Sequence, residues 1–451
     1  MNPALMRRIC GSSVAGRSRE RDMYPSDLVG AAGFLPGPEC AAIIGRTLTI
    51  DGGTYRHSRL ECICIRTGAQ VKNSVTGILS THVGSLPRSR EVEAQLLKKE
   101  RGEAFDSGAF DGVMRQGVAD IVARQTALGL DLVSDGETAK ISYSTYIKDR
   151  YTGFGGDFTP KPHLDLRDHP EFVERMKAFI GPRAARRMHC IGPVEIGDRA
   201  PLRNDIANLQ AALAAHPATE GFINAASPGV VAAFMPNQYY PSHEAYIEAL
   251  AEALREEYEA ITRAGLVVQI DCPDLAMARH TGFQDLTDAE FIQRAAFHVE
   301  ALNHALANVP VDQVRIHICW GNYEGPHDHD IELARILPAV LKVKARAILF
   351  EGANPRHEHE WTVWRDAPLP DDLILIPGVI DSCSNYVEHP ELVAQRIVRF
   401  AQIVGRERVI AGADCGFGTF AGLGKVDAGI AFKKLGSLVQ GAQLASTRLW
   451  P

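Results

Sequence analysis

Four residues with metal-ligand chemistry stand at the ends of short apolar segments in the second half of the chain. His317 and Cys319 end one segment, Glu351 ends a second and Cys415 ends a third. Side chains two residues apart on a strand point to the same side, so the imidazole and thiol of the H-x-C pair would face one point. An H-x-C pair alone is usually core packing, but packing does not explain three apolar strands that each stop on a metal ligand. Imidazole and thiolate donors select Zn²⁺ over Mg²⁺ or Ca²⁺, so the sequence predicts a zinc site.

The composition of this predicted site indicates what the metal would do. Two thiolates and a carboxylate outweigh the charge of Zn²⁺, which makes the ion a poor source of hydroxide. The same charge suits the binding of an incoming thiol as a nucleophilic thiolate, with Glu351 or a water as the oxygen ligand that leaves. A closed structural zinc is the alternative, but structural sites usually draw their ligands from loops at short spacing. Ligands from three separate strands favour catalysis.

Other polar side chains could bind a substrate. Glu137 and Asp271 each end an apolar segment, and a pair of carboxylates would suit a substrate ammonium group. Their alternative role is to cap the helices that follow. Asn237 and Tyr240, which precede a predicted helix, could supply a wall for substrate stacking or could equally pack at the rim.

Apolar segments that alternate with helical periodicity predict a repeated strand–helix architecture. The nine candidate strands are 78–82, 130–137, 187–195, 221–226, 266–271, 314–319, 346–351, 373–380 and 408–413. Eight such units give parallel strands that can close into a (βα)8 TIM barrel, an α/β fold, with 187–195 left over as an insertion hairpin. An open doubly wound sheet is the alternative. Polar residues after so many strands favour the barrel, whose catalytic groups collect on its C-terminal face.

Two predicted helices have clear ends. Apolar residues recur at helical spacing from Met114 to Leu128, and Gly129 is placed to end that helix. Ser242 is placed to cap a second helix, which Gly265 ends. The apolar face of the second helix consists of Ile247, Leu250, Leu254, Tyr258 and Ile261.

The overall composition narrows the class of protein. The 451 residues carry a net charge of −7 without a basic stripe, which argues against nucleic acid or an anionic membrane as a partner. No apolar run reaches the ~20 residues of a membrane helix, and the N-terminus lacks the apolar region of a signal peptide. The nine cysteines are dispersed and do not form a disulfide framework. We expect a cytoplasmic protein with reduced thiols, and the sequence leaves open whether it forms a homo-oligomer.

Residues 1–75 differ from the rest in being rich in Arg, Gly and Ser, with few periodic apolar segments. Two stretches, 24–32 and 45–53, resemble the closing helix and strand of a short-chain dehydrogenase, but no dinucleotide-binding glycine motif accompanies them. A fusion remnant or a mis-set start explains this segment better than a working oxidoreductase does. We expect an N-terminal extension over 1–75 that is poorly ordered or loosely docked, and a barrel domain over 76–451.

A series of motifs follows in order between Gly77 and Gly418. The motifs are Thr81–Pro87 (THVGSLP), Leu132–Glu137 (LVSDGE), Gln269–Leu275 (QIDCPDL), His317–Cys319 (HIC), Phe350–Glu351, Pro377–Asp381 (PGVID) and Asp414–Gly416 (DCG). Together they resemble the catalytic C-terminal half of the cobalamin-independent methionine synthases. This resemblance implies a βα-barrel with zinc on the four ligands named above. It also implies that homocysteine is held by the backbone of Ser85, with its ammonium group at Glu137 and Asp271.

The chain departs from that family in two respects. The large N-terminal half that the family uses in binding polyglutamylated folate is absent, and Asp381–Ser384 (DSCS) stands where the family carries a proton-donating His. Residues 320–327 and 353–360 are more similar to the single-domain branch, which includes the epoxyalkane:coenzyme M transferases. The His-rich strings 327–329 and 357–359 could form a second metal site, or loops at the barrel mouth that orient ligands or contact substrate.

We therefore predict a zinc-dependent thiol S-alkyltransferase that takes two small partners, a thiol acceptor and an alkyl donor. Methyl transfer to homocysteine giving methionine, of the 5-methyltetrahydropteroyltriglutamate–homocysteine S-methyltransferase type, is the favoured reaction. Alkyl transfer to another small thiol such as coenzyme M is the alternative, with Arg88, Arg279 and Arg356 as candidates for binding the sulfonate. A uroporphyrinogen-decarboxylase-like barrel and a non-catalytic zinc protein are weaker alternatives.

Overall fold

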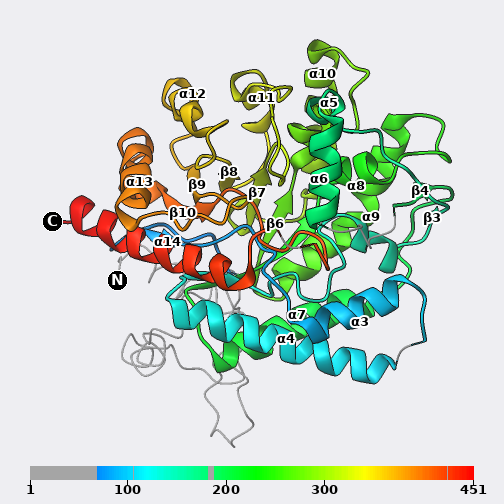
Figure 1. Cartoon of the computed structure of the whole chain (residues 1–451), viewed down its shortest axis with the longest axis horizontal. Helices are drawn as coiled ribbons and strands as arrows, with labels where there is room; N and C mark the ends of the chain where they lie inside the picture. Colours follow the sequence, from blue (N-terminus) through cyan, green and yellow to red (C-terminus); the bar gives the residue numbers. More distant parts are fainter. Residues whose placement is uncertain (1–68, 105, 181–186, 424) are drawn as a thin grey trace, which may run out of the picture. The chain divides into compact units, whose positions relative to one another are not determined.

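The computed structural model describes residues 69–104, 106–180, 187–423 and 425–451 (Figure 1). The predicted extension over 1–75 lies outside the described residues except for 69–75. In that part, the backbone N–H of Val71 donates to the carbonyl of Asp312 at 2.8 Å, and the hydroxyl of Ser74 donates to the carbonyl of Val409 at 2.6 Å. Both carbonyls precede barrel strands, so residues 69–75 pack against the amino ends of those strands. The packed unit therefore begins before residue 75.

The barrel predicted from the alternating pattern is confirmed. Within the described residues, eight parallel strands form one sheet in the order β1-β10-β9-β8-β7-β6-β5-β2. The strands are β1 (Leu79–Ser80), β2 (Leu132–Ser134), β5 (Glu220–Ala226), β6 (Val267–Asp271), β7 (Val314–Ile318), β8 (Ala347–Phe350), β9 (Ile374–Ile380) and β10 (Ile410–Ala413). Helices follow every strand and surround the sheet (Figure 1).

The helices run between consecutive strands, as parallel connections require, except α14, which follows the last strand. In chain order they are α3 (Arg90–Glu100) and α4 (Ser107–Leu128), α7 (Ala200–Ala215), α8 (Pro228–Phe234) and α9 (His243–Arg263), α10 (Asp288–Ala305), α11 (Leu333–Val340), α12 (Trp361–Asp366), α13 (Pro390–Val404) and α14 (Ala428–Leu449). The predicted end of α4 and the predicted start of α9 each have a physical basis. Gly129 ends α4 with a φ of 86°, and the Ser242 side chain caps α9 by accepting from the N–H of Ala245. None of the described helices is long and apolar enough to cross a membrane.

A side chain helps to close the barrel between its first and last strands in the sheet order. The carboxylate of Asp131, just before β2, accepts from both the N–H and the hydroxyl of Ser80 on β1, each at 2.8 Å. The hydroxyl of Thr81 also donates to the carbonyl of Leu132 at 3.3 Å. These side-chain hydrogen bonds connect β1 and β2, which are at the two ends of the sheet order and do not pair directly.

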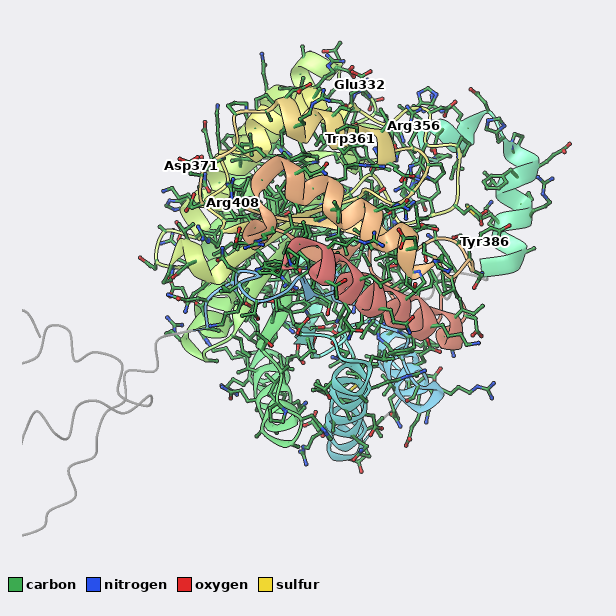
Figure 2. The ribbon with its side chains drawn as sticks, turned by 90° about the vertical axis from the view of Figure 1, so that its left-hand side faces the viewer. Glu332, Arg356, Trp361, Asp371, Tyr386 and Arg408 are labelled. Atoms are coloured by element: carbon green, nitrogen blue, oxygen red, sulfur yellow. The ribbon has the colours of Figure 1, made fainter. Side chains whose placement is uncertain are left out.

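The leftover strand of the prediction does lie outside the barrel. Strand β4 (His189–Cys190) pairs antiparallel with β3 (Phe154–Gly155), in an insertion that also contains α5 (Leu164–Arg167) and α6 (Pro170–Ile180). Figure 2 separates the two ends of the barrel: Asp371 and Arg408, which precede strands, lie on one side, and Arg356 and Tyr386, which follow strands, lie on the other.

Candidate metal centre

Two strand ends bring one imidazole and two thiols together. His317 lies in β7, Cys319 follows it directly, and Cys415 follows β10. Their ligand atoms all lie within 4.8 Å of one another, and all three residues are buried. The Nε2 atom of His317 is 3.9 Å from the sulfur of Cys415. These three residues, which we call the sulfur cluster, are three of the four ligands predicted from the sequence.

A carboxylate on the neighbouring strand orients the imidazole. Asp271 ends β6 and is paired with His317 in the β6–β7 register, which places its Oδ1 atom 3.4 Å from Nδ1 of the ring. Burial alone would lower the pKa of His317, but the contact with Asp271 and the negative charges of Cys319 and Asp271 raise it to about 9. With Nδ1 beside Asp271, the other ring nitrogen, Nε2, faces Cys415 and lies 3.1 Å from the carbonyl oxygen of Asp414.

The donor set fits a zinc ion. The hydrogen bond between the two thiols and the burial of Cys415 raise the pKa of Cys415 well above its ordinary value, so a nearby cation would be needed for this sulfur to ionise. Three nitrogen and sulfur ligands with a further position left for an oxygen or a substrate atom are typical of catalytic zinc sites. His317, Cys319 and Cys415 would hold such an ion.

The fourth predicted ligand stands beside the sulfur cluster and outside it. Oε1 of Glu351, which follows β8, lies 3.8 Å from the sulfur of Cys415 but accepts the N–H of Trp320 at 2.8 Å. Its Oε2 accepts from the side chain of Asn354 at 2.6 Å. Glu351 is thus held by two hydrogen-bond donors while its Oε1 atom stays 3.8 Å from the sulfur of Cys415, as suits a weakly bound ligand.

Asp414 supports this arrangement, although the sequence analysis did not single it out. Its carboxylate accepts the backbone N–H groups of Gly352, Ala353 and Asn354 at 2.8–2.9 Å, which fixes the turn after Glu351. Burial and the charge of Glu351 raise the pKa of Asp414 to about 7. A Cβ on Gly378 would lie 2.0 Å from Asp414 Oδ1, so this approach requires glycine. In the sequence, the position of Asp414 directly before Cys415 was the one feature that could have pointed to this role.

The two carboxylates predicted to bind an ammonium group are both buried and incompletely partnered. Within the described residues, Oε2 of Glu137 accepts no hydrogen bond, and Oδ1 of Asp271 has only its 3.4 Å contact with Nδ1 of His317. Burial raises the pKa of Glu137 to about 8, with Asp271 adding to the shift and Lys140 opposing it. The backbone around Ser85 lies close to the turn that carries Glu137, because the N–H of Leu86 donates to the carbonyl of Gly136 at 3.1 Å. Buried acceptors without a donor are expected where a cationic ligand group binds.

Asn237 and Tyr240 lie in a different environment. The side chain of Asn237 accepts the N–H groups of Tyr239 and Tyr240 and donates to the carbonyl of Tyr240. The hydroxyl of Tyr240 accepts the N–H of Val194 at 2.9 Å, and its ring stacks on Tyr246 at 5.6 Å. Their polar groups hold the chain around the insertion, so their predicted contact with substrate stays a prediction.

Two further residues border the site and were missed by the sequence analysis. Burial and the negative charge of Cys319 raise the pKa of Tyr143 well above its ordinary value, so its hydroxyl stays protonated at neutral pH. Asn224 on β5 donates to Asp271 Oδ2 and to the carbonyl of Val83, both at 2.9 Å, and fixes that carboxylate. Neither residue belongs to a recognisable spacing pattern; only the fold brings them to the site.

Comparison with known proteins identifies the chain's relatives. A family described as "Cobalamin-independent synthase, Catalytic domain" matches residues 198–443. A methionine synthase of Thermococcus kodakarensis is 24% identical over 81% of this chain and 93% of that protein. A 2-hydroxypropyl-CoM lyase of Xanthobacter autotrophicus is 25% identical over 82% of this chain and 96% of that protein.

A solved structure agrees with the fold. The B12-independent methionine synthase from Shewanella sp. W3-18-1, solved in complex with selenomethionine, superposes with a TM-score of 0.62 at 19% identity. The match covers 83% of this chain and 99% of that one. At this identity the likeness supports the barrel architecture.

Proposed function

The chain belongs to the family of cobalamin-independent synthase catalytic domains, and from that membership we propose that it is a zinc-dependent thiol S-alkyltransferase. The observation that carries the proposal is the sulfur cluster: two thiols and an imidazole from separate strand ends, with a carboxylate held one step away. Zn²⁺ bound there would let an acceptor thiol bind as a nucleophilic thiolate at neutral pH. Glu351, already engaged by Trp320 and Asn354, is the ligand most readily given up to that thiol.

Homocysteine is the favoured acceptor, and methionine the product. Oε2 of Glu137, which accepts no hydrogen bond from the described residues, and the carboxylate of Asp271 would receive the acceptor's ammonium group. A bound ammonium would offset the burial that raises the pKa of Glu137 to about 8, so the amine and the ionised carboxylate would stabilise each other. The relatives named methionine synthase support this choice.

The alkyl donor is less closely defined by the residues at the site. Burial raises the pKa of Cys383 to about 12, so this thiol stays protonated and is a poor general acid at neutral pH. Its sulfur donates to the amide oxygen of Asn322 at 3.2 Å. A 5-methyltetrahydropteroyltriglutamate-type donor would need another proton source for its leaving nitrogen, whereas a donor whose leaving group needs no proton would not.

Alkyl transfer to coenzyme M is the second candidate, favoured by the relative named 2-hydroxypropyl-CoM lyase. Its sulfonate would need a cationic partner. Arg88 already donates to the carbonyls of Gly418, Glu137 and Lys140, and Arg279 pairs with Asp288 at 2.7 Å. Arg356 is exposed and is the remaining candidate of the three arginines. These pairings make coenzyme M the weaker choice.

A cobalt-substituted enzyme tests the proposal. Homocysteine, coenzyme M and glutathione are titrated separately while the sulfur-to-Co²⁺ charge-transfer band is recorded. We expect a new band with homocysteine, and its absence in Cys415→Ser. Cys190→Ser, which changes a buried cysteine of β4, is the matched control and should behave like the wild type. No spectral change with any thiol, despite bound cobalt, would contradict the proposal and leave a non-catalytic metal protein.

A further inference from the structure

A second group of metal-ligand side chains lies on the loops after the strands. His163, Asp165 and His280 offer ligand atoms that all lie within 4.8 Å of one another. His163 and Asp165 flank the start of α5 in the insertion, and His280 follows the short turn Met277–Arg279 after β6. The N–H of Leu164 donates to the carbonyl of His280 at 3.0 Å, which ties the two segments together. We call these three residues the His–Asp cluster.

One carboxylate oxygen of Asp165 accepts hydrogen bonds, and the other accepts none from the residues that the structure describes. The residue is only 2% exposed. Its Oδ2 atom accepts from the hydroxyl of Tyr323 and from the N–H of His327, the latter at 3.1 Å. Its Oδ1 atom accepts no hydrogen bond from any residue that the structure describes. A buried carboxylate oxygen in that condition is costly unless a cation satisfies it.

His280 is arranged in the same way. The residue is completely buried, and its Nδ1 atom lies 3.0 Å from Oδ1 of Asp330. This close contact lacks hydrogen-bond geometry, and neither ring nitrogen of His280 has a hydrogen-bond partner among the described residues. A carboxylate on one ring nitrogen that leaves the other open is the usual setting of a metal-binding histidine.

The His-rich strings of the sequence supply the support for this cluster. His327 and His357 both lie against Oδ2 of Asp330, at 2.9 and 3.0 Å. These two contacts fix the carboxylate of Asp330 in front of His280. The strings 327–329 and 357–359 thus contribute one buried histidine each to positioning; His329 and His359 are exposed.

We propose that His163, Asp165 and His280 bind a divalent transition-metal ion, Zn²⁺ or a similar borderline cation, separately from the sulfur cluster. The two imidazoles and one carboxylate match the nitrogen and oxygen donors of known zinc sites, and three protein ligands leave one position for water. The ion joins the insertion to the loop after β6. Through Tyr323 and His327, which hold Asp165, it also orders the loop that begins directly after Cys319.

The two sites can be separated by their ligands. Full-length protein is loaded with Zn²⁺ and desalted, and zinc release is followed with a chromogenic chelator after adding p-hydroxymercuribenzoate. The mercurial displaces zinc from thiolates, so it empties the sulfur cluster and any other cysteine site. We expect one further zinc per chain that resists the mercurial and is released only by dipicolinate or on unfolding.

Two variants assign the resistant zinc. Asp165→Asn and His163→Gln should each lose it while keeping the mercurial-sensitive zinc, and Cys415→Ser should do the reverse. Asp168→Asn and His169→Gln, exposed neighbours in the same segment, are the matched controls and should keep both. Wild-type protein without any mercurial-resistant zinc would overturn the proposal. So would resistant zinc that persists in both Asp165→Asn and His163→Gln.

Discussion

The sulfur cluster and the His–Asp cluster differ in what holds their ligands. His317, Cys319 and Cys415 sit at the ends of barrel strands whose register is fixed by ladder hydrogen bonds. The His–Asp cluster has no ligand on a strand; it draws one residue from a loop and one from a short helix in the insertion, and one from a turn after β6. Strands hold side chains more rigidly than loops, which depend on added hydrogen bonds or metal ions for order.

The two clusters also differ in the groups around them, but in both a carboxylate lies beside a ring nitrogen of a histidine. Buried carboxylates, among them Glu137 and Asp271, accompany the thiols of the sulfur cluster, which suits a thiol substrate with an ammonium group. Beside the His–Asp cluster, Tyr323 and His327 donate to one oxygen of Asp165. His327 and His357 contact Asp330. In both, a carboxylate on a ring nitrogen orients the histidine: Asp271 for His317 and Asp330 for His280. The rigid sulfur cluster is therefore suited to catalysis, and the His–Asp cluster is suited to ordering the loops that carry it.

The largest expected effect breaks the sulfur cluster. Cys415→Ser replaces a soft thiolate with a hydroxyl that does not ionise at neutral pH, so alkyl transfer should fall about a thousandfold or more. The measurement is the rate of thioether formation from the acceptor thiol. Activity near that of the wild type would favour a barrel enzyme that needs no zinc, such as a uroporphyrinogen-decarboxylase-like protein.

Removing Asp414 tests the rigidity of the strand-borne site. Asp414→Ala leaves three buried backbone N–H groups without an acceptor and should lower the free energy of unfolding by about 3 kcal/mol. Urea denaturation measures the change. Asp381→Ala is the comparison variant, since its carboxylate accepts from two N–H groups of a less buried turn and should cost less. Equal losses for the two variants would contradict the role given to Asp414.

The shared orienting carboxylates are tested as a pair. Loss of a carboxylate that holds a metal-binding histidine typically weakens metal affinity by about 10–100-fold. Asp271→Asn should weaken only the mercurial-sensitive zinc, and Asp330→Asn only the mercurial-resistant zinc, as measured by chelator competition. A variant that weakened both classes of zinc equally would show that the two clusters are not independent.

The unpartnered carboxylate near the sulfur cluster predicts a pH dependence. Burial raises the pKa of Glu137 from 4.5 to about 8, so the folded protein holds this proton more tightly than the unfolded chain does. Its contribution to stability is therefore full below about pH 4.5 and is lost as the pH rises toward 8. Glu137→Gln should flatten the decline of the melting temperature across this window. An unchanged slope would mean that the carboxyl is ionised throughout.

The smallest effect is expected at Asn237, whose side chain bonds the backbone of its own turn. Asn237→Ala removes local hydrogen bonds at an exposed turn and should cost about 1 kcal/mol in unfolding free energy. The KM for the acceptor thiol should stay unchanged, because the side chain is occupied by its own turn. A tenfold rise in KM would restore Asn237 to the substrate-binding role predicted from the sequence.

The barrel and the sulfur cluster could be predicted from the sequence because both depend on patterns of neighbouring residues. Alternating apolar segments and helical faces report burial residue by residue, and each metal ligand ends such a segment. Once the strands are parallel, their carboxyl ends meet on one face, so His317, Cys319 and Cys415 could be brought together without knowing any distance. Helix ends such as Ser242 and Gly129 are local for the same reason.

What the tertiary structure alone decided are contacts between segments far apart in the chain. His280 meets His163 and Asp165 only because the insertion folds back over the loop after β6, and no periodicity records that path. The sequence predicts Glu351 as the zinc ligand that leaves, and only the fold shows that its oxygens accept from Trp320 and Asn354 while Oε1 lies 3.8 Å from the sulfur of Cys415. Residue types determine which chemistry is available, and side-chain hydrogen bonds across the fold determine which atoms are left to perform it.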